Sequence, residues 1–498
     1  MSSYDFELII IGAGPGGYVT AARAGKLGLK TAIVEKGTWG GVCLNVGCIP
    51  TKTLLKGAKV YHYVDECETY GVEISNKKTV NINWGKMQAR KNTVVKGLTN
   101  GVQFLMKANK VESIIGSASA VDSHTILVKL ADGKEKKYTT KYTMIATGSK
   151  VKMFDNPNGP KGLSTADLKT NKALLTSTEI LKVGEIPKSL TVIGGGVIGI
   201  EFACLFSALG TKVTIIEYLD RILALLDYDV SKELTTILEN RGVKIITGHS
   251  VNELNGKTLT YYAASDKEQK KPMTVTSDYC LLSTGRTPIT EGFTNLGIQI
   301  KPNHSFAVNE KLEALDDNNN PLDNIYVIGD ANGQRMLAHV ASAQGLMALN
   351  NIFVKEGKKS YDGTPLVQQK IDYNKMPSCI YTFPEVASVG WTEEECKIAK
   401  IDYLVKKLPF KNNGKALADS ETDGFVKIII GKKYGEILGA HILCSTATDM
   451  ISEIVNIMET EGTIVELANA CHPHPTLSEV VMDVAQDLEL EWYKVNKK

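Results

Sequence analysis

The sequence predicts an α/β protein with two Rossmann-like units and a C-terminal α+β region. Two segments share one pattern: an apolar strand, a glycine-rich loop, a helix, and a second strand ending in glutamate. The first loop glycine and the glutamate are equally spaced in both, 35 − 12 = 23 and 217 − 194 = 23 residues. From about residue 370 the pattern changes to alternating strands and an apolar helix over 447–458. These observations predict two dinucleotide-binding domains and a third domain of different architecture.

The first unit begins with the apolar run 8–11, which is typical of a buried parallel strand. Gly12, Gly14 and Gly17 follow at the spacing that lets a pyrophosphate approach a helix N-terminus. Glu35 closes the second strand, where it would accept a hydrogen bond from a ribose hydroxyl.

The second unit repeats these features with Gly194, Gly196, Gly199 and Glu217. One working site beside one relic is the less favoured alternative, because both units keep the acid. Glutamate at this position suits the free 2′-hydroxyl of NAD. Arg221, four residues later, is the residue type that a 2′-phosphate would require, so it keeps NADP open.

The segment 40–52 contains Cys43 and Cys48 with four residues between them. Pro50 is tolerated in the first turn of a helix, which we expect over 51–56. Cys48 would then lie at a helix N-terminus, where the helix dipole favours a thiolate. Two structural cysteines or half of a zinc site are the alternatives, although four residues is an outer spacing for zinc and no paired Cys/His cluster follows.

Length, net charge, apolar runs and cysteine content limit the class of protein to which this chain can belong. A length of 498 residues suggests roughly three domains. A net charge of +2 gives no electrostatic case for nucleic acid, and no apolar run approaches a membrane span. Nine scattered cysteines do not resemble a secreted disulfide framework, and the early strand leaves no room for a signal or transit peptide. We therefore expect a cytoplasmic protein, or a mitochondrial matrix protein in a eukaryote whose presequence is absent here.

The segment 40–52 resembles the active-disulfide motif of the pyridine-nucleotide disulfide oxidoreductases. The members that oxidise dihydrolipoyl groups have the pattern GGTCLNVGCIPSK, from which only Val42 and Thr51 depart. Because the cysteines follow the first unit, we expect FAD there and NAD in the second unit. The resemblance also implies that Cys43 exchanges with substrate and that Cys48 faces the flavin.

Further segments resemble the same family. Residues 142–149 and 280–286 resemble its two ATG-like closing strands, Asp330 takes the position that bonds the ribityl chain, and Lys52 would pair with Glu201 near the flavin. The implied FAD-binding residues are Gly12, Gly14, Gly17, Glu35, Lys52, Thr147, Gly148, Asp330 and Ala338. The implied residues for NAD, or close to the flavin, are Gly194, Gly196, Gly199, Glu201, Glu217 and Gly285.

The second chemical motif, residues 472–479, is similar to the family's HAHPTLSE, with Pro473 in place of alanine. Glu479 lies five residues after His474, within reach to orient and charge-stabilise its imidazole. The two predict a general acid/base pair, and the family places this histidine on the partner subunit. We expect His472 to be structural, and His339 to be structural or to act only indirectly.

The sequence departs from the family pattern elsewhere. Residues 342–344 (Ser-Ala-Gln) stand where relatives often carry acids, and Phe383 stands where relatives commonly have histidine. The connection over 151–175 looks longer than usual, and no function is assigned to it.

The resemblance implies a FAD- and NAD-dependent oxidoreductase that oxidises protein-bound dihydrolipoyl groups, the E3 component of 2-oxo acid dehydrogenase or glycine cleavage complexes. Its partners would be lipoylated E2 or H-type proteins and a second copy of the chain, with no metal, nucleic acid or membrane. An NADPH-dependent reductase of the glutathione reductase type and a flavoprotein that only scaffolds a complex are the alternatives. The expected domains are 1–155 (FAD, first part), 156–288 (NAD), 289–365 (completing the FAD region) and 366–498 (dimerisation).

Overall fold

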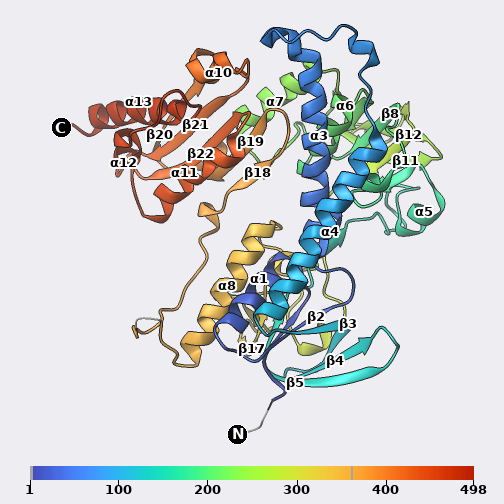
Figure 1. Cartoon of the computed structure of the whole chain (residues 1–498), viewed down its shortest axis with the longest axis vertical. Coiled ribbons are helices and arrows are strands. Elements are labelled where there is room, and N and C mark those ends of the chain that lie inside the picture. The colour runs from blue at the N-terminus through green and yellow to red at the C-terminus, as the bar shows by residue number, and fades with distance from the viewer. Residues whose placement is uncertain (1–3, 361–362, 498) are drawn as a thin grey trace. The chain divides into compact units, whose positions relative to one another are not determined.

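The structure, a computed structural model, describes residues 4–360 and 363–497 and divides into two compact units (Figure 1). The first comprises Met1–Thr53, Gln88–Lys152 and Gly285–Ile371. The second comprises Leu54–Met87, Met153–Thr284 and Asp372–Lys498. Among the helices of the described residues, none is both long and apolar enough to cross a membrane.

A parallel sheet with strand order β3-β2-β1-β5-β17 forms the centre of the first unit. The central strands β1 and β2 are apolar and mostly buried because helices cover them, as parallel sheets require. Helices α1 and α8 pack side by side on this unit (Figure 1). The bounds are β1 (Phe6–Ile11), α1 (Pro15–Lys26), β2 (Thr31–Glu35), β3 (Glu112–Asp122), β5 (Glu135–Ile145), β17 (Pro321–Val327) and α8 (Ala338–Lys355).

Antiparallel additions complete the first unit. Strand β4 (Thr125–Leu130) pairs with β3 and β5, and β16 (Glu313–Leu315) pairs with β17. A separate pair joins β6 (Ser149–Val151) to β15 (Arg286–Pro288), which brings together two segments that are far apart in the sequence.

The second unit contains the other Rossmann-like sheet, a parallel sheet of order β10-β9-β8-β14-β7. The residues between β10 and β14 form a small antiparallel sheet of order β11-β12-β13. The bounds are α5 (Thr165–Thr170), β7 (Leu174–Thr176), β8 (Ser189–Ile193), α6 (Val197–Ala208), β9 (Lys212–Ile216), α7 (Tyr228–Asn240), β10 (Lys244–Ile246), β11 (His249–Asn255), β12 (Thr258–Ala263), β13 (Met273–Thr276) and β14 (Tyr279–Leu282).

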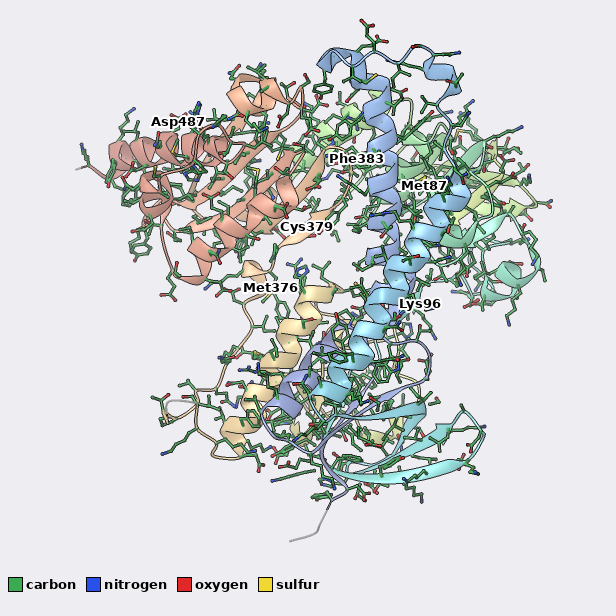
Figure 2. The ribbon with its side chains drawn as sticks, in the orientation of Figure 1. Met87, Lys96, Met376, Cys379, Phe383 and Asp487 are labelled. Atoms are coloured by element: carbon green, nitrogen blue, oxygen red, sulfur yellow. The ribbon has the colours of Figure 1, made fainter. Side chains whose placement is uncertain are left out.

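The C-terminal part of this unit is an antiparallel sheet of order β18-β19-β22-β21-β20. Helix α11 packs on β19 and β22, and α13 on β20 and β21. Figure 2 shows Cys379 on β18, Phe383 in the turn after it, and Asp487 on α13, where it pairs with Lys406 of β20 at 2.8 Å. The bounds are β18 (Ser378–Ile380), β19 (Glu385–Gly390), α9 (Glu393–Ala399), β20 (Tyr403–Pro409), α10 (Gly414–Ala418), β21 (Phe425–Gly431), β22 (Ile437–Cys444), α11 (Ala447–Glu459), α12 (Ile464–Asn469) and α13 (Glu479–Asn496).

The predicted fold class is confirmed, with two Rossmann-like sheets and a C-terminal α+β part. One helix boundary differs from the expectation. Helix α3 (Cys48–Glu66) begins at Cys48, two residues before Pro50, because the Gly47 carbonyl already accepts bonds from the Thr51 amide (3.2 Å) and hydroxyl (2.6 Å). Pro50 therefore occupies the third position of the first turn, where its missing N–H leaves no bond unmade. Helix α4 (Trp84–Ala108) is the next α-helix in the chain.

Candidate active site

The cysteine segment is anchored beside the first glycine loop. Short helix α2 (Gly41–Val46) carries Cys43, and α3 starts at Cys48. The Gly40 amide donates to the Ala13 carbonyl at 2.8 Å, and a Cβ on Gly41 would meet the Gly14 Cα at 2.8 Å. Glycine at 41 therefore permits a close backbone approach that brings both cysteines to the end of β1.

Cys43 and Cys48 are half-buried thiols that interact with each other in this structure. The hydrogen bond between the two sulfurs, and next burial, raise the pKa of the Cys43 thiol far above its ordinary range, while Lys52 opposes the shift. Cys48 has the first position of α3, where the helix dipole favours a negative charge. Burial and the sulfur contact thus favour the protonated thiol at Cys43, and the helix position favours a thiolate at Cys48.

A buried polar cluster lies in the same unit. The Arg286 guanidinium donates from Nε to the Ser149 hydroxyl and from Nη2 to the Ser149 carbonyl, both at 2.7 Å. The Ser149 hydroxyl donates to Asp330 Oδ2, which lies 3.9 Å from Arg286 Nε. Burial lowers the pKa of Arg286, and the negative charges of Asp330 and Cys48 counter that shift. This cluster places a cation next to a candidate FAD-binding carboxylate and within electrostatic reach of Cys48.

Four further predicted site residues lie close in the sequence to members of this cluster: Thr147, Gly148, Gly285 and Ala338. The Thr147 hydroxyl donates to the Ile289 carbonyl at 2.6 Å, which ties the end of β5 to the segment after β15. Gly148 (φ +74°) and Gly285 (φ +114°) have backbone conformations that L side chains rarely adopt. Ala338 is the first residue of α8.

The two glycine loops have the same geometry. Gly12 and Gly194 both have φ +104°, and a Cβ on Gly17 or Gly199 would meet the carbonyl of that first glycine at 1.9 or 2.1 Å. A Cβ on Gly14 or Gly196 would meet no described atom within 4 Å. In both loops, therefore, the first glycine makes the turn, the second leaves room for a pyrophosphate, and the third packs helix on strand.

The two acids are also held alike. Glu35 accepts from the amides of Ala13 (2.8 Å) and Gly37 (2.7 Å). Glu217 accepts from the equivalent amides, Gly195 (2.5 Å) and Leu219 (2.8 Å). Each carboxylate is fixed at the mouth of its own glycine loop, where a ribose would lie.

The Arg221 side chain contacts residues of its own loop. Its Nη2 donates to the Ala224 carbonyl at 3.1 Å, and its guanidinium lies over the Tyr228 ring, 5.5 Å from the centroid. These contacts hold it with local partners, which weakens the NADP alternative.

The C-terminal loop brings His474 and Glu479 together. His474 is exposed (80% of its side chain) and its Nδ1 lies 2.8 Å from Glu479 Oε1. The other carboxylate oxygen accepts from the Thr476 amide at 2.8 Å. The Thr476 amide, and then His474, lower the pKa of Glu479, so the carboxylate is ionised at neutral pH. Because an ionised carboxylate only accepts, Nδ1 is the donor and Nε2 of a neutral imidazole keeps its lone pair.

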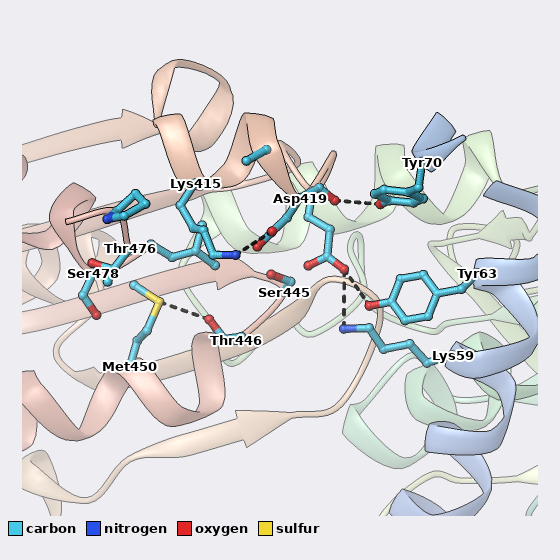
Figure 3. Close-up of a pocket in the computed structure, with 14 residues that line it drawn as sticks. Lys59, Tyr63, Tyr70, Lys415, Asp419, Ser445, Thr446, Met450, Thr476 and Ser478 are labelled. Carbon is cyan, nitrogen blue, oxygen red and sulfur yellow. Dashed lines mark hydrogen bonds and ion pairs between the residues drawn. The ribbon is translucent and has the colours of Figure 1, made fainter. Parts of the chain in front are cut away.

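A cavity of about 710 Å³ lies beside this loop, lined by Pro475–Ser478, α10, the end of α3 and the start of α11 (Figure 3). Its charged groups pair with one another. Lys415 contacts Asp419 at 2.6 Å, Glu421 lies 3.9 Å from Lys59, and the Tyr63 hydroxyl donates to Glu421 at 2.8 Å. These pairs join α3 and α10 to residues 419–421, the segment that follows α10.

The structure brings some predicted residues together and leaves others apart. Cys43, Cys48 and Asp330 belong to the first unit, as does Lys52, whereas Glu201 belongs to the second. Glu201 is buried (4% exposed) and accepts from the Tyr381 amide at 3.1 Å. The ion pair between Lys52 and Glu201 stays a prediction.

Sequence reasoning missed three contributors to the site. Ser149 and Arg286 hold Asp330, and Tyr18 on α1 is close enough to the cysteines for their charges, after burial, to raise its pKa. Ser149 and Arg286 had a signal in the sequence, since each directly follows a predicted site residue, Gly148 and Gly285. Gln344, one of the departures from the family pattern, is buried and accepts from the Gly329 amide at 2.6 Å, so it fixes the turn that carries Asp330.

Comparisons with known proteins show the family of this chain. The family described as pyridine nucleotide-disulphide oxidoreductase matches residues 6–345, and its dimerisation domain matches residues 376–485. The chain is similar to dihydrolipoyl dehydrogenase of Mycoplasma genitalium, with 41% identity over 98% of this chain and 100% of the relative. It is also similar to that of Geobacillus stearothermophilus, with 38% identity over 97% and 96%.

Solved structures have the same fold. The HOCl-induced flavoprotein disulfide reductase RclA from Escherichia coli is 26% identical, covers 97% of this chain and 99% of its own, and gives a TM-score of 0.79. LpdA from Mycobacterium tuberculosis gives 0.83 at 23% identity, with coverage of 97% and 99%, which is a likeness of fold alone. From the family matches and the identities over nearly the whole length, the chain belongs to the pyridine nucleotide-disulphide oxidoreductase family and, within it, to the dihydrolipoyl dehydrogenases.

Proposed function

We propose that this chain oxidises protein-bound dihydrolipoyl groups with NAD⁺, using the Cys43–Cys48 pair, FAD, and His474 with Glu479. The observation that carries the proposal is the pair of interacting thiols, Cys43 on α2 and Cys48 at the start of α3, beside the first glycine loop. Enzymes of this family use FAD and NAD, so the chain needs two dinucleotide sites.

The first unit fits FAD. The open position at Gly14 would admit a pyrophosphate, and Glu35 would hold a ribose. Asp330, Thr147, Gly148, Lys52 and Ala338 are the further residues that we assign to FAD. When bound, FAD supplies a two-electron carrier between the dithiol and NAD⁺. The second unit fits NAD through Gly194, Gly196, Gly199 and Glu217, and Gly285 and Glu201 are the further residues that we assign to NAD or to the flavin.

The proposed exchange uses this chain's own groups. In the oxidised enzyme Cys43 and Cys48 form a disulfide. His474 Nε2 takes a proton from a dihydrolipoyl thiol, and the thiolate attacks Cys43, so that Cys48 leaves as a thiolate. His474 then gives this first proton to water and deprotonates the second dihydrolipoyl thiol. The new thiolate closes the lipoyl disulfide and releases Cys43, which takes the second proton from His474. Both substrate electrons then reside on the enzyme pair, with Cys43 as a thiol and Cys48 as a thiolate.

Glu479 supports both proton transfers. It fixes the imidazole tautomer through Nδ1 and stabilises the imidazolium that forms. The cysteines and His474 belong to different units, and we infer that the base is His474 of the partner subunit, because residues 376–485 match the family's dimerisation domain.

The remaining assignments follow from the same proposal. Residues 1–155 and 289–365 would form the FAD region, 156–288 the NAD domain and 366–498 the dimerisation domain. Lipoylated E2 or H-type proteins would be the partners. The cytoplasm is the proposed location, since reducing conditions keep a catalytic disulfide exchangeable.

The direct test is reduction of NAD⁺ by dihydrolipoamide with the purified, FAD-loaded enzyme. We expect turnover that His474→Ala and Cys43→Ser both abolish. Turnover with glutathione disulfide and NADPH, and none with dihydrolipoamide, would replace the proposal by the glutathione reductase type of activity. Affinity capture of lipoylated proteins from a lysate identifies which complex is served.

Glu217 predicts the choice of nucleotide. Its fixed carboxylate would lie against a 2′-phosphate, and like charges placed together cost several kcal/mol, so we expect kcat/KM for NAD to exceed that for NADP by at least about tenfold. Glu217→Ala should reduce this ratio. Arg221→Ala is the matched control and should leave it unchanged, because Arg221 is held by local carbonyls. A preference for NADP in the unchanged enzyme would contradict the assignment.

A further inference from the structure

His472 is held at both ring nitrogens. Its side chain is only 6% exposed, and Nδ1 lies 2.9 Å from the Ala470 carbonyl oxygen. Its Nε2 makes a hydrogen bond with Oε1 of Glu453, in the middle of α11. Both ring nitrogens therefore have a partner, a backbone carbonyl on one side and the Glu453 carboxyl group on the other.

This pair is one of two His–Glu contacts on the same loop, and the two histidines differ sharply. The side chain of His472 is almost buried and that of His474 is 80% exposed, although one proline separates them. Beyond His474, the Asn413 side chain donates to the Thr476 carbonyl at 3.1 Å, and Glu479 accepts from the Thr476 amide. The loop is thus fixed on both sides of His474, before it by His472 and after it by Thr476.

We propose that His472 and Glu453 are positioning residues for His474, which anchor the loop to α11 and so set the direction in which His474 presents Nε2. This inference rests on the proposed function, in which His474 is the base. Glu479 and Asp483 of α13 are the other charged groups that interact electrostatically with His472.

The test compares Glu453→Gln and His472→Gln with Glu459→Gln, a matched change on the same helix at a side chain that is 55% exposed. We expect the first two to lower kcat for dihydrolipoamide by about 10- to 100-fold with KM little changed, since small misplacement of a catalytic group costs up to about 10²-fold. Glu459→Gln should behave as the unchanged enzyme.

A second readout separates positioning from loss of fold. Reduction of an artificial electron acceptor by NADH bypasses the dithiol exchange, so it should stay within twofold in both variants. Unchanged dihydrolipoamide turnover in both variants, or an equal fall in the NADH–acceptor rate, would overturn the proposal. Lack of dihydrolipoamide turnover in the unchanged enzyme would instead refute the proposed function.

Discussion

At the scale of single residues, the two reactive thiols are chemically different although they are neighbours. The Cys43 thiol keeps its proton because it bonds to Cys48 and is partly buried, while Cys48 has the first position of a 19-residue helix. Exchange chemistry requires this division, since the outer sulfur must be attacked and the inner one must leave as a stable thiolate.

Replacing each cysteine tests which sulfur carries the charge. In the FAD-loaded, two-electron-reduced enzyme, a thiolate beside the flavin gives a long-wavelength absorbance band. We expect Cys48→Ser to abolish this band and Cys43→Ser to retain or strengthen it, as read from the visible spectrum. The reverse result would mean that the two roles are exchanged.

The sequence predicted the reactive residues better than the residues that hold them. Cys43, Cys48, His474 and Glu479 lie within short motifs, and their local spacing determines their chemistry. Ser149 and Arg286 are 137 residues apart, and only the pairing of β6 with β15 brings them together beside Asp330. No local pattern contains that information, because the contact is created by sheet topology.

At the scale of elements, one buried lysine joins three of them. Lys427 on β21 is 3% exposed and contacts Asp227 and Asp229 at the start of α7 (2.9 and 2.7 Å) and Glu393 on α9 (2.8 Å). The sequence predicts alternating strands in this region, and every residue of β21, Lys427 included, is buried. Alternation cannot distinguish an exposed lysine from one with buried partners.

Lys427→Met should therefore destabilise the second unit. Removing one partner of a buried charge cluster leaves the others uncompensated, so we expect a loss of about 3–5 kcal/mol in the free energy of unfolding, measured by denaturant titration at pH 7. Lys407→Met is the matched control, because Lys407 pairs with the same Asp229 at 2.8 Å but is 44% exposed, and should cost under about 1 kcal/mol.

The same cluster predicts how this difference depends on pH. Burial raises the pKa of Glu393, but hydrogen bonds from Lys397 and Lys427 outweigh burial and lower this pKa to about 2. Burial also raises the pKa of Asp229, but hydrogen bonds from Lys407 and Lys427 lower it overall. A carboxyl group whose pKa is lower in the folded than in the unfolded protein stabilises the fold at pH values above its unfolded pKa. This stabilisation is lost as the pH falls through its folded pKa. The gap between the unchanged protein and Lys427→Met should narrow from about pH 4.5 towards pH 2. A gap that is constant over this range would show that packing, not charge, accounts for it.

At the scale of the whole molecule, the chemistry depends on residues from both ends of the chain. The thiol pair lies in the first unit and the His474–Glu479 pair in the second, within the part that matches a dimerisation domain. Helix α11 has a buried apolar face inside that part. Its Glu453 bonds to His472, so α11 is linked to the loop that carries the base.

Mixing two inactive variants tests whether one active site is shared between two chains. Cys43→Ser removes the attacked sulfur, and His474→Ala removes the base. If the base comes from the partner, a heterodimer with one change in each chain has one site with both defects and one site with neither. Subunit exchange should then restore dihydrolipoamide turnover that neither parent has, approaching a quarter of the unchanged rate when the chains assort at random in equal amounts, since about half of the dimers are mixed and each has one intact site of two. Mass measurement of the dimers verifies the exchange. Verified heterodimers without activity would place His474 in the site of its own chain.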